Sequence, residues 1–325
     1  MDLPAQRSSE ICRPEKDFSM DIVITGSSGL IGLALSSALS AQSHRVITLV
    51  RREPKPGTDE IRWDPLSGKI DSDSLEGVDA VIHLAGAGIG DRRWSKAYRQ
   101  VLVDSRVNST GLLAKTMASA TRPPARFLSG SAIGFYGNRG DEPLDETSSQ
   151  GQGFLPDLVN KWETAAAPAI DAGIPTAMLR TGIVLSKAGG ALQKLLTIFK
   201  IGLGGRMGSG QQFMSWITID DQVRAIIELL DSPIVGPVNL TAPGACTNKD
   251  FTAALGSALR RPAVLPVPAF GPKLLLGSEL AQALLFDSAN VKPAVLVDHG
   301  FEFLHPTLDV GLESILSSPV ANQSN

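Results

Sequence analysis

The sequence has only two cysteines, Cys12 and Cys246, and they lie far apart in a chain of 325 residues. Neither belongs to a close pair of the kind that holds zinc, and the four histidines are also scattered along the chain. This pattern excludes a disulfide-stabilised secreted scaffold and is typical of proteins from a reducing compartment. The sequence therefore predicts no metal site and favours a cytoplasmic protein.

Long hydrophobic runs and an excess of charge of one sign are also missing. No uninterrupted apolar stretch approaches the roughly 18 residues that a membrane helix needs. Residues 1–18 are polar and lack the apolar core of a signal peptide. The formal net charge is −3, and the only local basic cluster, at residues 92–99, is typical of a solvated helix face. The sequence therefore predicts neither a membrane partner nor a nucleic-acid partner.

The most informative stretch joins an apolar strand to an apolar helix through three glycines spaced three residues apart. In such a turn, Gly26 permits the tight change of direction, Gly29 lets the backbone approach a pyrophosphate, and Gly32 lets the helix pack closely on the strand. The first turn of the helix then offers free N–H groups to phosphate oxygens. The pattern predicts a dinucleotide-binding turn formed by Gly26, Ser27, Ser28, Gly29, Leu30, Ile31 and Gly32.

The residues that end the second expected strand, at residues 44–50, indicate which dinucleotide binds. NAD-binding proteins usually place Asp or Glu there to hold the ribose 2′-hydroxyl, whereas this chain has Arg51 and Arg52. A carboxylate would repel the 2′-phosphate of NADP, but two guanidinium groups bind it through charge-assisted hydrogen bonds. We therefore predict NADP as the cofactor. The alternative is that both arginines are simply a solvated strand end.

Strand and helix patterns alternate over the first half of the chain. This alternation predicts an α/β fold with a Rossmann-type doubly wound parallel sheet, which binds ligands at the carboxyl ends of its strands. After Leu185 the alternation gives way to glycine-rich loops and further helices, which predicts a smaller C-terminal substrate lobe. The expected strands are residues 21–25, 44–50, 61–63, 79–85, 125–131, 176–184 and 238–241, and the expected helices are residues 30–39, 95–119, 154–172 and 220–230.

The domain boundaries follow from the same pattern. We expect a disordered N-terminal extension at residues 1–19, an NADP-binding Rossmann domain at residues 20–184, and mainly a substrate lobe at residues 185–316. Segments around residues 216–241 are expected to return to the Rossmann domain, and residues 317–325 to form a disordered tail. The expected partner is a small-molecule substrate, and the sequence leaves a homodimer open.

Several short motifs together resemble the extended short-chain dehydrogenase/reductases, a group that includes nucleotide-sugar epimerases. More specifically, they resemble an atypical subgroup called epimerase family proteins, whose members carry a C-terminal segment of unknown function. The resemblance covers about residues 20–316 and implies an oxidoreductase or epimerase of unknown substrate. It rests on the glycine turn and on His83-Leu84-Ala85-Gly86, residues 129–137, Trp63-Asp64-Pro65, Ser105-Arg106, Lys161-Trp162-Glu163, residues 202–211, Ser215-Trp216-Ile217, Val291-Lys292-Pro293 and residues 300–303.

The resemblance also implies cofactor-binding residues outside the glycine turn. Arg106 aligns with the helix Asn of the usual proton relay when Thr110 serves as the anchor, and a cation there favours a nearby pyrophosphate or 2′-phosphate. Lys161 matches the lysine that holds the nicotinamide ribose; the alternative is that it only pairs on the helix surface. The remaining implied cofactor residues are Asp64, Leu84, Ala85, Gly86 and Val184.

The chain departs from the parent family at the catalytic tyrosine. Typical members use a Tyr with a Lys four residues later, and the ammonium lowers the pKa of the phenol so that it exchanges a proton near neutral pH. This chain has two tyrosines, Tyr98 and Tyr136, and neither has Lys at that spacing. If Lys161 is the Lys of the motif, the tyrosine position holds Asp157, a residue type whose unperturbed pKa is about 4.

Other side chains are candidates for the missing acid. Ser131 matches the family's substrate-orienting serine and could donate to a carbonyl oxygen, although a serine can also simply cap a strand end. Tyr136 could supply the proton from the following loop, although shielding of the nicotinamide or filling of the pocket is the favoured role. The catalytic candidates are therefore Ser131, Tyr136, Asp157 and Lys161.

Two glycine-rich loops near the expected site each have two interpretations. Residues 138–153 follow the active-site strand and form either a lid or an exposed loop. Residues 202–210 either bring backbone N–H groups and Arg206 to an anionic substrate or are simply turns. Two functions therefore remain open: an NADP(H)-dependent oxidoreductase or epimerase with a non-standard acid, and a non-catalytic NADP(H)-sensing regulatory protein.

Overall fold

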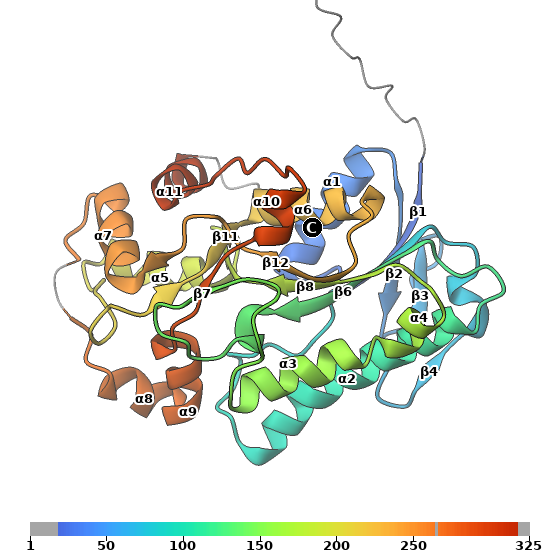
Figure 1. The fold of residues 1–325 in the computed structure, drawn as a ribbon, viewed down its shortest axis with the longest axis horizontal. Coiled ribbons are helices and arrows are strands. Elements are labelled where there is room, and N and C mark those ends of the chain that lie inside the picture. Colours follow the sequence, from blue (N-terminus) through green and yellow to red (C-terminus); the bar gives the residue numbers. More distant parts are fainter. Residues whose placement is uncertain (1–18, 264–265, 318–325) are drawn as a thin grey trace, which may run out of the picture.

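The computed structural model describes residues 19–263 and 266–317 of the chain. The extension expected at residues 1–19 and the tail expected at residues 317–325 lie almost wholly outside the described residues. Within the described part, no helix combines the length and the apolar character that crossing a membrane requires. Helices enclose one large central sheet, as Figure 1 shows.

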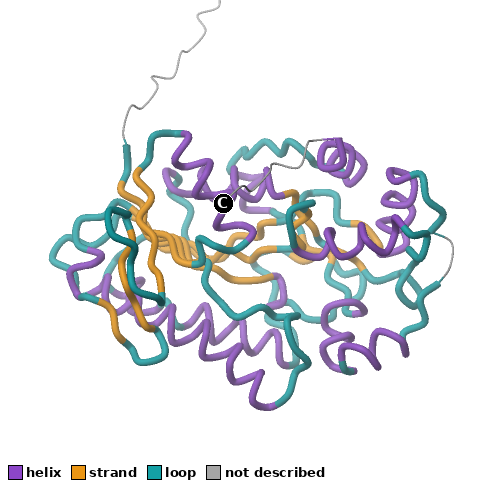
Figure 2. Tube along the Cα trace, turned by 180° about the vertical axis from the view of Figure 1, so that it is seen from behind, coloured by secondary structure: helices purple, strands orange, loops and turns teal. Residues whose placement is uncertain are grey.

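The central sheet has eight strands in the order β12-β8-β6-β5-β1-β2-β3-β4, and Figure 2 shows it from behind. Neighbouring strands are parallel except β3 and β4, which are antiparallel. The strands are β1 (Asp21–Thr25), β2 (Arg45–Val50), β3 (Glu60–Asp64), β4 (Lys69–Ile70), β5 (Ala80–His83), β6 (Arg126–Ala132), β8 (Thr176–Thr181) and β12 (Gly236–Leu240). This arrangement confirms the predicted α/β fold with a doubly wound parallel sheet.

The order of the strands reverses at β1. From β1 the chain adds β2 and β3 on one side and later adds β5, β6, β8 and β12 on the other. Thr25, the last residue of β1, pairs with Leu49 of β2 and with His83 of β5. Because open α/β sheets bind ligands beyond the carboxyl ends of their strands at such a reversal, the fold places Gly26 where a dinucleotide is expected.

Helices cover both faces of the sheet (Figure 1). One face carries α1 (Leu30–Ala41), α6 (Ile219–Asp231) and α10 (Ala294–Asp298), and the other carries α2 (Lys96–Ala118), α3 (Phe154–Thr164) and α4 (Ala167–Asp171). Successive strand residues point to opposite faces. Ile24 therefore packs with Leu35 in one core, whereas Val23 packs with Leu113 in the other.

The strand expected at residues 176–184 is interrupted. β8 ends at Thr181, and after Gly182 the chain continues as β9 (Ile183–Leu185), which pairs with β11 (Trp216–Thr218) in a separate sheet. A Cβ at Gly182 would lie 2.8 Å from the carbonyl oxygen of Ser215. This close approach explains why the change of partner strand occurs at a glycine.

The helix expected at residues 154–172 is also interrupted. α3 ends at Thr164 and α4 begins at Ala167, with Pro168 in its first turn. Proline fits the first turn of a helix but lacks the N–H that a helix interior needs. The sequence also failed to indicate α5 (Gly190–Lys200), because two glycines begin the segment and loops were expected there.

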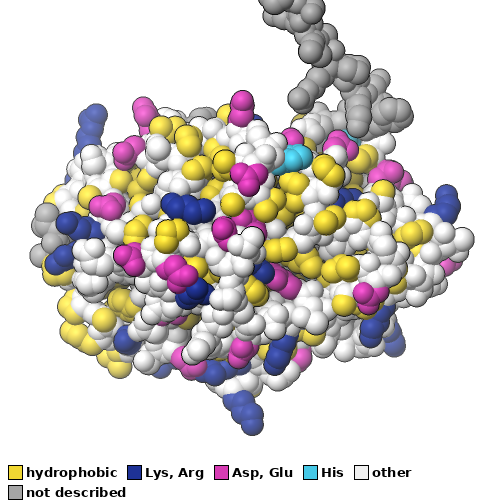
Figure 3. All heavy atoms as spheres, in the orientation of Figure 1, with side chains coloured by type: hydrophobic (Ala, Val, Ile, Leu, Met, Phe, Trp, Pro, Cys, Tyr) yellow, Lys and Arg dark blue, Asp and Glu magenta, His cyan; other side chains and the backbone are white. Residues whose placement is uncertain are grey.

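A smaller C-terminal lobe is present, as the sequence predicted. It contains α5, α7 (Asn248–Leu259), α8 (Phe270–Leu276), α9 (Ser278–Ala281), the π-helical segment Gln282–Phe286, α11 (Leu308–Ser317), and the paired strands β10 (Phe213–Met214) and β13 (Cys246–Thr247). Trp216, Phe251 and Leu312 are buried in its core. Apolar side chains of α8, including Leu274 and Leu275, are exposed instead. Figure 3 shows hydrophobic side chains, in yellow, gathered at the lower left, where Figure 1 places α8.

Candidate functional site

The glycine turn connects β1 to α1 in a geometry that depends on two of its glycines. Gly26 has φ +72°, and a Cβ there would lie 2.8 Å from the backbone carbonyl carbon of Leu84. A Cβ at Gly32 would collide with the carbonyl oxygen of Gly26. Gly29 is the N-cap of α1 and provides no capping side chain, so the first N–H groups of the helix can bind phosphate oxygens. The turn therefore fits the pyrophosphate of a dinucleotide.

The loop after β9 lies against the start of α1. A Cβ at Gly189 would lie 3.2 Å from Cδ1 of Leu30, and a Cβ at Gly190 would lie 3.5 Å from the carbonyl oxygen of Val184. Val184 and Ile31 both pack against the same core. The structure thus brings Val184, an expected cofactor residue, close to the glycine turn.

Hydrogen bonds tie the carboxyl ends of β1 and β5 together beside this turn. The hydroxyl oxygen of Thr25 accepts from the backbone N–H groups of Leu84 and Ala85, both at 3.2 Å. Its proton is therefore directed to Nδ1 of His83, 2.6 Å away, and we assign the imidazole proton to Nε2, which lies 3.0 Å from Oγ of Ser109. His83 is thus a neutral structural side chain that fixes the loop carrying Leu84 and Ala85.

Arg106 extends from α2 to the same loop. Its guanidinium carbon lies 5.1 Å from the ring centroid of Trp162. A Cβ at Gly86 would lie 3.3 Å from the same guanidinium carbon. Among the described residues its hydrogen-bond acceptor is the carbonyl oxygen of Leu102, at 3.2 Å, and no carboxylate pairs with it. Burial lowers the pKa of Arg106 to about 10, and burial together with this cation lowers the pKa of His83 to about 3. The structure therefore brings together Arg106 and Gly86, both expected at the cofactor.

The two arginines after β2 have different surroundings. Arg52 donates to both carboxylate oxygens of Glu60, at 2.6 and 2.8 Å, and the hydrogen bonding to Arg52 lowers the pKa of Glu60 to about 2. Arg51 is exposed, and no described residue forms an ion pair or hydrogen bond with its side chain. Arg51 is therefore the arginine whose whole guanidinium is available to a ligand.

Asp64, which the resemblance places at the cofactor, supports the turn from β3 to β4. Its Oδ1 accepts from the N–H of Leu66 at 3.1 Å, and its Oδ2 accepts from the hydroxyl of Ser67 at 2.6 Å. The hydrogen bond from Ser67 is the main cause that lowers the pKa of Asp64. The turn thus occupies this carboxylate, and a contact between Asp64 and a cofactor stays a prediction.

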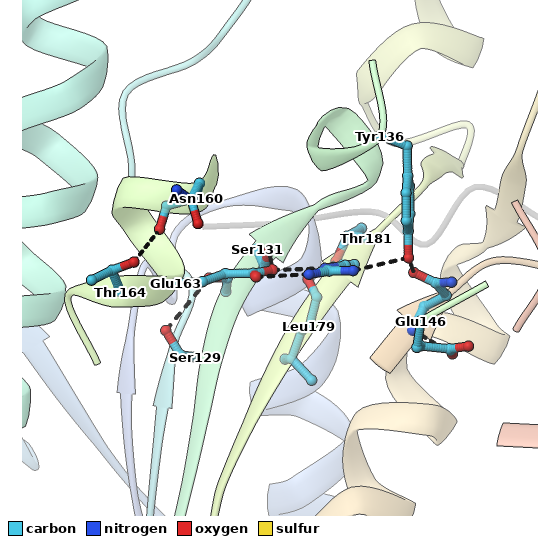
Figure 4. A network of polar contacts seen from close by, with 12 residues as sticks. Ser129, Ser131, Tyr136, Glu146, Asn160, Glu163, Thr164, Leu179 and Thr181 are labelled. Carbon is cyan, nitrogen blue, oxygen red and sulfur yellow. Dashed lines mark hydrogen bonds and ion pairs between the residues drawn. The ribbon is translucent and has the colours of Figure 1, made fainter. Parts of the chain in front are cut away.

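Four polar side chains form a chain of hydrogen bonds at the carboxyl ends of β6 and β8 (Figure 4). Ser131 on β6 donates to Oε1 of Glu163 on α3 at 2.5 Å. Arg180 on β8 donates to both carboxylate oxygens of Glu163, at 2.8 and 2.9 Å. It also donates to the hydroxyl oxygen of Tyr136 at 3.1 Å. The structure thus links Ser131 and Tyr136, two expected catalytic residues, through Glu163 and Arg180.

Tyr136 is fully buried, and burial raises the pKa of its phenol. Its hydroxyl donates to Oδ1 of Asn239 on β12 at 2.7 Å. The amide of Asn239 in turn donates to the carbonyl oxygen of Lys292, and its backbone N–H donates to Oε1 of Glu146. The phenol therefore joins the segment after β6 to β8 and β12 of the central sheet. A role for Tyr136 as proton donor requires release of the bond that its O–H donates to Asn239, whereas the bond that it accepts from Arg180 leaves this proton unoccupied.

Asp157 and Lys161 lie one helical turn apart on the exposed face of α3. Oδ1 of Asp157 accepts a hydrogen bond from Nε2 of Gln150 at 3.1 Å. Two residues beyond Lys161 the helix has turned, so that Glu163 faces the sheet. The structure therefore separates the Asp157–Lys161 pair from the network that contains Ser131.

Strand pairing and hydrogen bonds connect the loop at residues 138–153 to residues 288–291. Its strand β7 (Pro143–Leu144) pairs in parallel with β14 (Asn290–Val291). The N–H of Arg139 donates to the carbonyl oxygen of Ser288 at 2.8 Å, and the N–H of Ser288 donates to the side chain of Asn138 at 3.0 Å. In this conformation the loop is part of the interface between the central sheet and the lobe.

Hydrogen bonds also hold the loop at residues 202–210 against the C-terminal lobe. The N–H of Met207 donates to Oδ1 of Asn248 at 2.7 Å, and the carbonyl oxygen of Arg206 accepts from the N–H of Val267 at 2.8 Å. The side chain of Arg206 is exposed and donates to the carbonyl oxygen of Ser209 at 3.4 Å. A contact between Arg206 and an anionic substrate stays a prediction.

Sequence reasoning assigned no role to Glu163 or Arg180. Glu163 was visible only as the end of a Lys-Trp-Glu motif, and Arg180 only as a charged residue in an otherwise mostly apolar strand segment. A charge in a buried strand requires a buried partner of opposite sign. Arg180 was therefore the signal that could have revealed the pair.

The parallel sheet, the glycine turn at its reversal and the smaller lobe define a protein of the short-chain dehydrogenase/reductase class. Residues 22–156 match the NAD dependent epimerase/dehydratase family, and residues 267–315 match a domain of unknown function, DUF1731. The chain is 43% identical over 299 residues to the epimerase family protein Mb2239 of Mycobacterium bovis, which covers 92% of this chain and 98% of that protein. It is also 35% identical over 302 residues to the human epimerase family protein SDR39U1, and this match covers 92% of the present chain and 100% of the human protein. The chain therefore belongs to the epimerase family proteins of the SDR39U1 type, an atypical subgroup of that class.

Two solved structures are similar over most of the chain. The human epimerase family protein SDR39U1 (isoform2), solved with NADPH, has a TM-score of 0.85 and 33% identity, and the match covers 92% of this chain and 100% of that one. A nucleoside-diphosphate sugar epimerase from Corynebacterium glutamicum has a TM-score of 0.75 and 37% identity, and the match covers 92% and 58%. These similarities confirm the expected family and fold, which are those of NAD(P)-binding proteins.

Proposed function

We propose that the protein is an NADP(H)-dependent oxidoreductase or epimerase that acts on a small-molecule substrate. The observation that carries the proposal is the glycine turn at the reversal of the sheet, in which neither Gly26 nor Gly32 has room for a Cβ. The similar human protein was solved with NADPH, which supports the same cofactor here. We expect the protein in the cytoplasm, as its cysteine usage favours, and leave a homodimer open.

The choice of NADP over NAD rests on the end of β2. Within the described part of the chain the guanidinium of Arg51 has no partner, and the neighbouring Arg52 is oriented by Glu60. A 2′-phosphate gains charge-assisted hydrogen bonds from Arg51 that a 2′-hydroxyl does not. NADPH is therefore expected to bind more tightly than NADH.

The chain's own residues would orient the reacting groups. When bound, the nicotinamide ring transfers hydride to or from a carbon of the substrate. The Ser131 hydroxyl lies at the carboxyl end of β6, and because its proton is directed to Glu163, its oxygen can orient a substrate by accepting a hydrogen bond from a hydroxyl on that carbon. Glu163, fixed by Arg180, accepts a hydrogen bond from Ser131 and so holds the hydroxyl in place. The candidates for the missing acid stay Ser131, Tyr136 and Asp157, and of these Asp157 lies on the exposed face of α3, away from the network that contains Ser131.

A second function, NADP(H) sensing without catalysis, is favoured by one observation. The phenol of Tyr136 is fully buried and engaged by Asn239 and Arg180, so the described residues present no free tyrosine hydroxyl beside Ser131. Such a protein would bind the cofactor and change conformation without turnover.

The full chain, incubated with NADPH and a panel of carbonyl compounds and nucleotide sugars, distinguishes the two functions. The enzyme proposal expects oxidation of NADPH, or interconversion of isomers, with at least one member of the panel. Tight binding of NADPH without turnover on any member contradicts the enzyme and supports the sensor. Failure to bind NADPH contradicts both.

A further inference from the structure

Ser131 and Glu163 form a short hydrogen bond in the network of Figure 4. Oγ of Ser131 lies 2.5 Å from Oε1 of Glu163 and donates its proton to this carboxylate. The oxygen of Ser131 is therefore left to accept a hydrogen bond from a substrate hydroxyl. A hydroxyl that accepts on one side and donates to a carboxylate on the other forms a path along which a proton can pass. The two side chains thus have the geometry of a relay that leads from the substrate to Glu163.

We propose that Glu163 takes up, through Ser131, the proton that a substrate alcohol loses when it is oxidised. This inference rests on the proposed function, because it completes the proton path of the same site. The C–H bond on the carbon that bears the hydroxyl breaks, and the hydrogen leaves with its electron pair as hydride to NADP⁺. The hydroxyl proton passes to Oγ of Ser131, while the proton of Ser131 passes to Oε1 of Glu163. The products are a carbonyl group, NADPH and a neutral Glu163, and reduction of the carbonyl group reverses each transfer.

Arg180 remains stabilised when Glu163 becomes neutral. Before the reaction it pairs with the carboxylate of Glu163 at 2.8 and 2.9 Å. Its guanidinium carbon also lies 3.6 Å from the ring centroid of Phe135, and it donates to the hydroxyl oxygen of Tyr136 at 3.1 Å. The face of an aromatic ring attracts a cation, so the buried charge keeps two partners after Glu163 takes up the proton. The side chain of Glu163 is 13% exposed, which gives this proton an exit to water.

Glu163 is the carboxylate that the described residues place against Ser131. Tyr136 lies on the other side of Arg180, and its proton is directed to an amide oxygen on β12. Asp157 lies on the exposed face of α3, away from this network. The proton path through Ser131 therefore ends at Glu163. Because the oxygen of Ser131 accepts, the site fits a substrate that carries a hydroxyl, which makes an alcohol the expected substrate class.

The test measures turnover by the full chain with cyclohexanol or UDP-glucose and NADP⁺, and with cyclohexanone and NADPH. Glu163→Gln keeps the size of the side chain and a hydrogen-bond acceptor but cannot take up a proton. It should lower kcat about 10²- to 10⁴-fold in both directions, whereas KM and the calorimetric affinity for NADP⁺ should change by less than about threefold. Glu163→Asp, which keeps a carboxylate, should recover part of the rate. Glu228→Gln, an exposed control on α6, should leave kcat unchanged.

Infrared difference spectra give a readout other than the rate. During a single turnover of the alcohol, the wild type should show the carbonyl band of a protonated carboxyl group. This band shifts in heavy water, which distinguishes it from the carbonyl band of the product. Glu163→Gln should lack the band, because its side chain cannot become a carboxylic acid.

Several results would overturn the inference. A wild-type kcat in Glu163→Gln, persistence of the carboxyl band in that variant, or absence of the band from the wild type while it oxidises the alcohol would each do so. If Glu163→Gln fails to fold, the double variant Glu163→Gln with Arg180→Met, which buries no unpaired charge, should fold and show the same loss of kcat, and a wild-type kcat there is equally contrary. No turnover by the wild type in either direction would instead contradict the proposed function itself.

Discussion

Arg180 on β8 holds the carboxylate of Glu163 on α3 through two hydrogen bonds, at 2.8 and 2.9 Å, and its side chain is only 4% exposed. The pair joins a helix to the middle of the central sheet. It also fixes the oxygen that accepts the hydrogen bond from Ser131. One ion pair thus contributes both to the packing of the fold and to the geometry of the candidate site.

Removal of one partner of this pair should be strongly destabilising. Arg180→Gln leaves the carboxylate of Glu163 without its counter-charge, and we expect the free energy of unfolding to fall by about 3–5 kcal/mol in urea denaturation. The double variant Arg180→Met with Glu163→Leu removes both charges and should recover part of that loss. The exposed control Arg122→Gln should change stability by less than about 0.5 kcal/mol. An equally small effect of Arg180→Gln would show that the pair is not needed for stability.

The glycine turn allows stability and cofactor binding to be separated. Gly32→Ala forces a Cβ into the carbonyl oxygen of Gly26 and should cost about 1–3 kcal/mol of stability. At Gly29 the backbone has φ −79° and a Cβ would lie 3.3 Å from that oxygen, so Gly29→Ala should fold with nearly normal stability. It should still weaken NADPH, because the methyl group occupies the approach to the pyrophosphate. Melting and NADPH titration of the same samples check both results, and normal NADPH binding by Gly29→Ala contradicts the phosphate position.

The neutral His83 should make stability depend on pH. Its pKa in the folded protein is lowered from 6.5 to about 3, so the unfolded chain binds the additional proton between these values. The stability contributed by neutral His83 is complete above about pH 6.5 and is lost as the pH falls toward 3. The limiting slope is about 1.4 kcal/mol per pH unit.

Urea denaturation between pH 6.5 and 5, where most carboxylates are still ionised, isolates this effect. His83→Gln should flatten the slope in that interval, whereas the exposed control His299→Gln should not. The assignment of His83 as a neutral structural residue fails if both variants keep the wild-type slope.

The resemblance that aligns Asp157 with the family tyrosine predicts a gain of activity. If Asp157 occupies the place of the family tyrosine, Asp157→Tyr restores a phenol one turn before Lys161. General acid–base catalysis contributes roughly 10²–10⁴ in rate, so part of this factor should appear in NADPH-dependent reduction of carbonyl compounds. Ser131→Ala in the same background should remove the gain. Normal family-like turnover by the wild type that Tyr136→Phe abolishes would instead identify Tyr136 as the acid.

The features that the sequence predicted have local signals. The alternation of strands and helices predicted the parallel sheet, and the spacing of Gly26, Gly29 and Gly32 predicted its turn. The features that it missed depend on contacts between distant segments. Glu163 and Arg180 are recognised as partners only when α3 is packed on the sheet. The pairing of β7 with β14 joins segments almost 150 residues apart, and neither two-residue strand has a periodic pattern.

The most direct test of the account is a comparison of NADPH and NADH binding by isothermal titration calorimetry. The wild type is expected to bind NADPH more tightly than NADH. Arg51→Ala should weaken NADPH about ten- to hundredfold, the effect of losing a charged hydrogen bond, and leave NADH nearly unchanged. Arg52→Ala should have a smaller effect on NADPH, because Glu60 already occupies its guanidinium. Equal affinity of the wild type for both cofactors, or equal losses of both in Arg51→Ala, would contradict recognition of the 2′-phosphate at the end of β2.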